Sequence, residues 1–166
     1  MLVFIHHDTR LVRIAGIRRN PVADWVLQCA RNLSMDLAEC ANPVKFLIRD
    51  RDTKFSSSFD AVFAAKDTRV IKTPIGAPRA SAICERVIGT IRRECLDWTL
   101  ILGRRHLAAL LEHVEHYNAH RPHRHLRQRA PSALGTAPAL IGDVDPTRLR
   151  RTDHLGGLIH EHRMVA

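Results

Sequence analysis

The stretch FLIRDRDTKF, Phe46–Phe55, runs from three apolar residues into two aspartates, Asp50 and Asp52, with arginines between them. The apolar residues have the composition of a buried strand. Aspartate is common in turns, so a turn that ends the strand explains both acids. Alternatively, one of them holds a metal ion at the end of the strand. The stretch alone leaves both interpretations open.

The pattern on either side predicts an α/β protein. Strands are predicted at Leu2–Ile5, Leu11–Ile17, Val44–Ile48 and Arg69–Lys72, and helices from Asn20 as N-cap to Ala38, at Ser57–Ala65, from Ile83 to Trp98 and at Arg105–Ala119. The first two strands form a hairpin. In open sheets of this kind, ligands bind beyond the carboxyl ends of the strands. Val44–Ile48 is apolar enough to be covered on both faces, and Asp50 follows it.

The two last helices carry apolar stripes. Ile83, Val87, Ile91, Cys95 and Trp98 follow one another at spacings of four, four, four and three, which predicts one apolar face. In the final helix, Leu107, Leu110, Leu111, Val114 and Tyr117 are predicted to point inward. These faces indicate helices that pack against a core.

The charge of the chain is strongly basic. Lysine and arginine together number 26 against 17 acidic residues, which gives a net charge of +9 and a pI near 10.4. Most of the basic residues are arginine, whose planar fork bonds two phosphate oxygens at once. This excess indicates a polyanionic partner, most simply nucleic acid. A solvated arginine-rich surface explains it equally well.

Length and composition exclude several classes of protein. The 166 residues fit one domain that can bury a core. There is no run of 18 apolar residues, so no membrane span is predicted, and the opening MLVFI is too short for a signal peptide. The four cysteines form no CxxC pair, which predicts free thiols in a reducing cytoplasm.

A second acid, Glu85, follows the proline- and glycine-containing loop Thr73–Ser81 near the start of a predicted helix. An acid in a first helical turn is usually only a partner of the helix dipole. Here Arg86, Arg92 and Arg93 lie on the same predicted helix. Glu85 is therefore either a metal ligand beside a track for phosphates or part of an ion-paired surface helix.

Three motifs together resemble the catalytic core of the DDE integrases and transposases. They are IRDRDTKF, then TPIGAPRASAICERVIGTIRREC with Glu85, and finally YNAHRPHRHL, Tyr117–Leu126. Asp50 and Glu85 have 34 residues between them, close to the spacing of the family's second and third carboxylates. The resemblance covers Met1 to Pro131 and is closest to bacterial insertion-sequence transposases with a retroviral-integrase-type core.

The resemblance implies a ribonuclease H-like α/β fold, a mixed sheet with flanking helices. It implies catalytic and metal-binding roles for Asp50 and Glu85, two Mg²⁺ or Mn²⁺ ions in a complete site, and cleavage and strand transfer on DNA. It further implies transposon ends and target DNA as partners, a homo-oligomer, no membrane association, and a cytoplasmic, nucleoid-associated location in bacteria. The residues expected to contact DNA are Lys72, Arg79, Arg86, Arg92 and Arg93.

The sequence departs from the family at its start. The family's first aspartate lies on a strand before the hairpin with which this chain begins. The first strand and one carboxylate are therefore expected to be missing, which leaves an incomplete core over 1–131 and a basic, turn-rich tail over 132–166. Asp8 is a poor substitute because it lies in the turn of the hairpin.

Three interpretations follow. The chain is an amino-terminally truncated DDE catalytic domain, or an inactive remnant of one that binds only DNA or partners, or an unrelated arginine-rich nucleic-acid-binding module in which Asp50 and Glu85 are accidental. Separately, His113, His116 and His120 share a face of the last helix. They are either zinc ligands or, as expected here, a solvated or DNA-facing basic surface.

Overall fold

The computed structural model describes residues 1–40, 43–76, 81–98, 104–135 and 146–165. The chain forms two compact units. The first unit contains Met1–Ile5 and Arg13–Arg86, and the second contains His6–Val12 and Val87–Ala166. The division predicted between residues 131 and 132 does not coincide with these units and stays a prediction.

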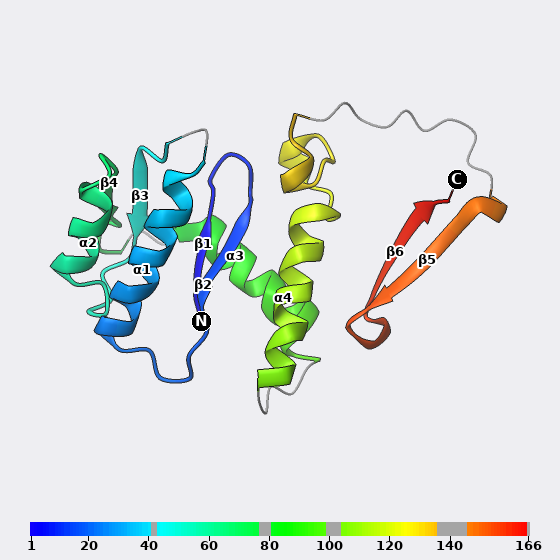
Figure 1. Ribbon diagram of the computed structural model, residues 1–166, viewed down its shortest axis with the longest axis horizontal. Helices are drawn as coiled ribbons and strands as arrows, with labels where there is room; N and C mark the ends of the chain where they lie inside the picture. The colour runs from blue at the N-terminus through cyan, green and yellow to red at the C-terminus, as the bar shows by residue number, and fades with distance from the viewer. Residues whose placement is uncertain (41–42, 77–80, 99–103, 136–145, 166) are drawn as a thin grey trace. The chain divides into compact units, whose positions relative to one another are not determined.

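The strands of the first unit lie in two small sheets (Figure 1). β1 (Leu2–Ile5) pairs with β2 (Val12–Gly16), and β3 (Phe46–Arg49) pairs in parallel with β4 (Arg69–Lys72). No ladder joins β1 to β3, so the mixed sheet is interrupted in the described part of the chain. This is the position at which the resemblance places a further strand. Each sheet therefore has an edge there without a strand partner among the described elements.

Two helices cover one face of β3 and β4. They are α1 (Ala23–Ala38) and α2 (Ser57–Ala64), and their buried residues Val26, Ala30, Leu33, Phe59 and Phe63 form the core of this unit. α2 begins where Ser56 caps it, because the serine side chain accepts a hydrogen bond from the Phe59 amide. α1 begins later than predicted, since Val22 and not Asn20 occupies its N-cap.

The other face of β3 is not covered as predicted. Leu47 points into the core, as alternation along a strand requires, but Phe46 and Ile48 are 56% and 51% exposed. The prediction that this strand is buried on both faces is therefore wrong for the described structure. An apolar run alone does not distinguish a strand covered once from a strand covered twice.

The end of β3 is held by a buried ion pair. The Arg49 guanidinium donates from Nε and Nη2 to the two carboxylate oxygens of Asp60 on α2, at 2.8 and 2.7 Å. Its third nitrogen donates to the backbone oxygen of Asp50 at 2.8 Å. Lys72 at the end of β4 also reaches Asp60, at 3.6 Å. One carboxylate thus ties both strands to the helix above them.

The second unit is mainly helical. α3 (Ala82–Ile91) continues the chain from the first unit and passes into the π-helical segment η2 (Arg92–Leu96), and α4 (Arg104–Ala119) follows. Val87, Ile91 and Cys95 are buried, as their spacing predicts. Trp98 is 71% exposed instead, because the π-helical turn shifts the residues after it away from the predicted face. Leu111, predicted to point inward, is also exposed.

The segment predicted to be turn-rich contains regular structure. β5 (Leu149–His154) and β6 (Ile159–Met164) form an antiparallel hairpin with the register Leu149↔Met164 to His154↔Ile159. Short 3₁₀ turns precede and join these strands, at Arg124–Leu126, Pro131–Ala133, Pro146–Arg148 and Leu155–Gly157. Among the described helices, none is long and apolar enough to span a membrane.

The Arg49–Asp60 pair predicts a large effect of removing one partner. Asp60→Asn should lower the free energy of unfolding by about 2 kcal/mol, because the buried guanidinium keeps its desolvation cost and loses its charged partner. The hydrogen bond from Arg49, outweighing burial, lowers the pKa of Asp60 below its ordinary value of 3.8. The stabilisation is therefore complete above pH 3.8 and is lost as the pH falls below it.

Urea denaturation of native protein and variants measures this effect. Asp36→Asn is the matched control, since Asp36 is an exposed aspartate on α1, and it should change the free energy by less than about 0.5 kcal/mol. Equal stability of the Asp60 and Asp36 variants would contradict the importance assigned to the ion pair.

Candidate functional site

Asp50 lies directly after β3, and its side chain is exposed. Its Oδ1 accepts a hydrogen bond from the backbone amide of Asp52 at 3.0 Å, so the residue does act in the turn. The guanidinium of Arg49 donates a hydrogen bond to the backbone oxygen of Asp50. The side chain therefore starts from a fixed backbone and points to solvent, a placement compatible with both interpretations of the opening motif.

Asp52 is engaged elsewhere. Its two carboxylate oxygens accept from the backbone amide of Lys54 at 2.9 Å and from the Lys54 ammonium at 2.8 Å. These hydrogen bonds from Lys54 lower the pKa of Asp52. Asp52 is thus a turn residue with its own cation, which leaves Asp50 as the better candidate for a metal ligand.

Glu85 is exposed in the first turn of α3. Within the described ranges, no hydrogen bond or ion pair engages its carboxylate. The prediction of an ion-paired surface helix is therefore not met at this residue. An acid at the start of a helix is stabilised as a carboxylate by the helix dipole, and here it stays available to a ligand.

The half-buried Cys84 lies within electrostatic range of both acids. Burial, and then the negative charges of Asp50 and Glu85, raise the pKa of its thiol. A carboxylate at the end of β3 and one at the start of α3 therefore act on the same group, although 34 residues separate them. Both belong to the first unit. Their convergence in one site, which the spacing of the two motifs predicts, stays a prediction.

The pair does not amount to a complete metal site. In the part of the chain that the structure describes, no three His, Cys, Asp or Glu side chains are grouped to hold an ion. Asp8 lies in the exposed turn between β1 and β2, beside His7. Carboxylate oxygens are the ligands that Mg²⁺ and Mn²⁺ prefer, so Asp50 and Glu85 fit the metal in kind but not in number.

The basic residues expected to contact DNA are placed differently from one another. Lys72 belongs to the first unit and pairs with Asp60, whereas Arg86 is exposed on α3 directly after Glu85. Arg92 and Arg93 are exposed in η2, where Arg92 lies 3.9 Å from Asp97. Arg79 lies outside the described residues. All the described members keep solvent-exposed charge available to a polyanion.

The motif Tyr117–Leu126 has a structural role in the second unit. The Asn118 side chain accepts from the Val12 amide and donates to the Val12 oxygen, both at 2.9 Å, so it pairs with this backbone as a neighbouring strand would. Arg121 lies over the Tyr117 ring and forms an ion pair with Glu94. These contacts fix the end of α4.

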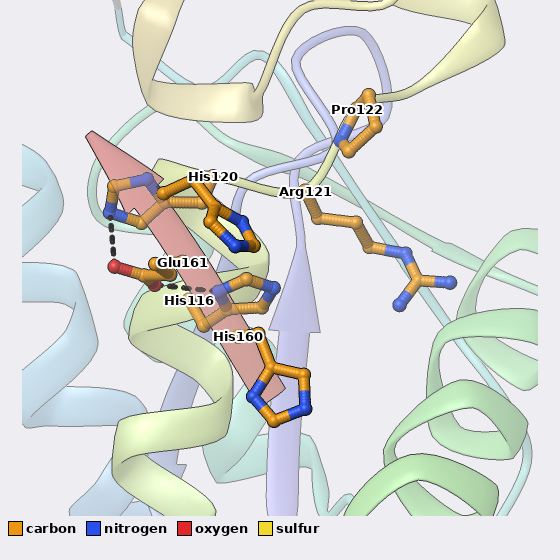
Figure 2. Close-up of a pocket in the computed structure, with 7 residues that line it drawn as sticks. His116, His120, Arg121, Pro122, His160 and Glu161 are labelled. Carbon is orange, nitrogen blue, oxygen red and sulfur yellow. Dashed lines mark hydrogen bonds and ion pairs between the residues drawn. The ribbon is translucent and has the colours of Figure 1, made fainter. Parts of the chain in front are cut away.

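The histidines of α4 do not share one solvated face as predicted. They follow one another along one side of the helix, but His113 is completely buried, and burial lowers its pKa, whereas His116 is half-buried and His120 is exposed. The latter two border a pocket of about 500 Å³ with Arg121, Pro122, His160, Glu161 and His162 (Figure 2). Sequence reasoning did not identify Glu161 because its partners on α4, His116 and His120, are 41 or more residues away. The local signal on α4 is the four-residue spacing of Glu112, His116 and His120.

Part of the chain matches a known protein family. The family model "Integrase core domain" matches residues 66–131, which include Glu85 and the Tyr117–Leu126 motif but not Asp50. No curated protein matches the chain.

A solved structure shares the fold. It is a chain of the "CryoEM structure of simian T-cell lymphotropic virus intasome in complex with PP2A regulatory subunit B56 gamma", with a TM-score of 0.60 and 15% identity. The alignment covers 93% of this protein and 56% of that chain, so the protein spans little more than half of the chain it resembles. Residues 66–131 are thus similar to an integrase core domain, and the protein shares the α/β fold of that intasome chain.

Proposed function

We propose that the protein acts in DNA integration or transposition and contributes Asp50 and Glu85 to a metal-dependent site for phosphodiester cleavage and strand transfer. The observation that supports this most directly is the joint action of the two carboxylates on Cys84, beside an integrase core domain. Arg86 and Lys72 belong to the same unit as the two acids and would bind the DNA backbone close to them.

The chemistry assigns a role to each group. When bound, divalent ions would stabilise the attacking and leaving oxygens of an in-line displacement. Asp50 and Glu85 would hold them through carboxylate oxygens, with water and substrate phosphate as the remaining ligands. The attacking oxygen would come from water in cleavage and from a DNA 3′-hydroxyl in joining. Arginine, which stays charged and forks around phosphate, would fix the DNA strand.

The partners proposed are the ends of a mobile element, target DNA and further copies of the chain. Joining two DNA ends to a target requires more than one set of carboxylates at the same place, so a homo-oligomer is proposed. The bacterial cytoplasm, at the nucleoid, is the proposed location. The arginine-rich character of the chain supports the DNA partner through a sequence-independent attraction to phosphate.

A second function is favoured by one observation. Because no third carboxylate joins Asp50 and Glu85 among the described residues, the chain would serve as a DNA-binding form that does not catalyse by itself. The integrase core domain over residues 66–131 counts against the third interpretation, an unrelated arginine-rich module.

Metal binding separates these functions from a turn-only role of Asp50. Titration with Mn²⁺, followed by electron paramagnetic resonance, should show weak binding that Asp50→Asn abolishes, because two carboxylates leave most of the shell to water. Asp52→Asn is the matched control and should bind as the native protein does. Equal binding by native protein and Asp50→Asn would remove Asp50 from the site.

Cys84 provides a second readout of the same titration. A cation between Asp50 and Glu85 cancels the charges that raise the pKa of the thiol, so Mg²⁺ should increase the rate of Cys84 alkylation, followed by peptide mass spectrometry. The increase should disappear in Asp50→Asn and persist in Asp52→Asn. An unchanged rate in native protein would show that no ion enters between the two acids.

DNA binding should depend on salt through the exposed arginines of α3 and η2. Changing Arg86, Arg92 and Arg93 to Ala should reduce the slope of log affinity against log salt by about 0.9 for each phosphate that the variant no longer binds. Fluorescence anisotropy between roughly 50 and 200 mM salt measures this slope. A control with Arg18, Arg19 and Arg31 changed to Ala removes the same charge from other exposed positions, and an equal slope in both variants would exclude this helix as the DNA contact.

Catalysis should require a third carboxylate. We expect the 166-residue chain to show no joining of a labelled element-end duplex with Mn²⁺, and a longer form with a preceding aspartate-bearing strand to show it. The reason is geometric, since a displacement of about 1 Å in a reacting group costs roughly a hundredfold in rate. Joining by the 166-residue chain that Glu85→Gln abolishes would mean that another residue supplies the missing ligand.

A further inference from the structure

The β5–β6 hairpin has almost no core of its own. Most residues of both strands are exposed, and an isolated two-stranded hairpin is marginally stable in water. It lies in the same compact unit as α4. Its attachment to that helix therefore decides whether the hairpin is a fixed part of the unit.

The contact between hairpin and helix is made by histidines and carboxylates. The carboxylate of Glu161 on β6 pairs with two imidazoles of α4 (Figure 2). His116 Nδ1 lies 2.7 Å from its Oε1, and His120 Nε2 lies 3.3 Å from its Oε2. His154 of β5 adds a third, with its Nε2 at 3.3 Å from Glu161 Oε2. The other ring nitrogen of His154 lies 2.8 Å from Glu112 of α4.

The two surfaces have matching patterns. Glu112, His116 and His120 follow one another every fourth residue, so they form one stripe along α4. In the hairpin register, His154 pairs with Ile159 and Thr152 with Glu161, which places His154 and Glu161 on the same face. The acid of the helix meets the histidine of the hairpin, and the acid of the hairpin meets the histidines of the helix.

Partial burial strengthens these contacts. The side chains of His116, Glu161 and His154 are 18%, 19% and 25% exposed, so water screens their charges less than it screens an ordinary surface pair. Direct hydrogen bonds and ion pairs join these residues.

The other charged groups near these five residues either pair with a different partner or lie at other positions of the hairpin and of α4. Arg121 pairs with Glu94, and on the opposite face of the hairpin Arg151 and His160 both bind Asp153. His162 lines the pocket, and Arg163 and Arg150 oppose one another across the strands. On α4, Glu115 is exposed and His113 is fully buried.

We propose that Glu112, His116, His120, His154 and Glu161 form a proton-dependent clasp that holds the hairpin on α4 and tightens as mildly acidic conditions protonate His154. This inference concerns the second unit and does not depend on the DNA chemistry proposed for the first. At neutral to alkaline pH the imidazole of His154 loses its positive charge, its hydrogen bond to the Glu112 carboxylate loses its charge assistance, and the hairpin opens more often.

The direction of the pH dependence follows from both partners. The hydrogen bond to Glu112, and then the charges of Glu161 and Glu112, raise the pKa of His154 above its ordinary 6.5, so its contribution is complete below pH 6.5 and is lost as the pH rises through the raised value. Burial opposes ionisation of Glu161, but the hydrogen bond from His116 and the nearby histidine charges lower its pKa below 4.5. Its contribution is lost only below that pH, so the clasp is strongest between about 4.5 and 6.5.

Amide hydrogen exchange tests the clasp in the full chain. Protection factors of the β5 and β6 amides, corrected for intrinsic exchange, should be roughly tenfold higher at about pH 6 than at about pH 8.5, the effect of one charge-assisted hydrogen bond. Amides of α1 in the other unit provide the internal reference for global stability. Glu161→Gln, which keeps the shape and removes the charge, should bring the ratio between the two pH values close to one.

Two further variants make the result decisive. His154→Gln should also flatten the pH dependence, whereas Asp153→Asn, which changes a carboxylate on the opposite face of the same hairpin, should retain it. The clasp would be refuted by equal protection of the native hairpin at both pH values, by a native ratio in Glu161→Gln, or by loss of the ratio in Asp153→Asn.

Discussion

The fork of Arg49 around Asp60 is the contact on which the candidate site depends. The Arg49 side chain is only 6% exposed, and one guanidinium binds the carboxylate of α2, the backbone oxygen of Asp50 and the face of the Phe55 ring. The strand end, the helix and the turn therefore share one buried cation. Because the side chain of Asp50 is exposed and can change rotamer, the position of its backbone sets where its carboxylate can reach.

The local sequence pattern is sufficient to predict those strands, turns and helices whose formation depends on residues close together in the chain. The strand ending at Arg49, the aspartate after it and the helix that presents Glu85 all follow from apolar periodicity and turn chemistry. The burial of Val87, Ile91 and Cys95 follows from the same periodicity. No local pattern predicts that Asp50 and Glu85 share a site. That prediction rests on the resemblance to a known core, and the effect of both charges on Cys84 is compatible with it.

Other features depend on contacts that no local pattern encodes. Phe46 and Ile48 look like residues of a strand covered twice, and their exposure is decided by which strands and helices lie beside them. The exposure of Trp98 depends on a single π-helical turn, and its indole donates to the backbone oxygen of Arg93 instead of entering the core. The β5–β6 hairpin is hidden by its composition, since LRRTDH and IHEHRM contain few of the residues that favour strands.

The bond between Asn118 and Val12 constrains the order in which the chain can acquire its structure during synthesis. The two residues are 106 positions apart, and the amide of Asn118 satisfies both the donor and the acceptor of Val12. Val12 belongs to the second unit, although it lies close to the amino terminus. While only the first unit has emerged from the ribosome, the backbone amide and carbonyl of Val12 therefore stay hydrated. They form their hydrogen bonds to Asn118 only after α4 has emerged. Such long-range closure slows folding and makes the second unit the late step of co-translational folding.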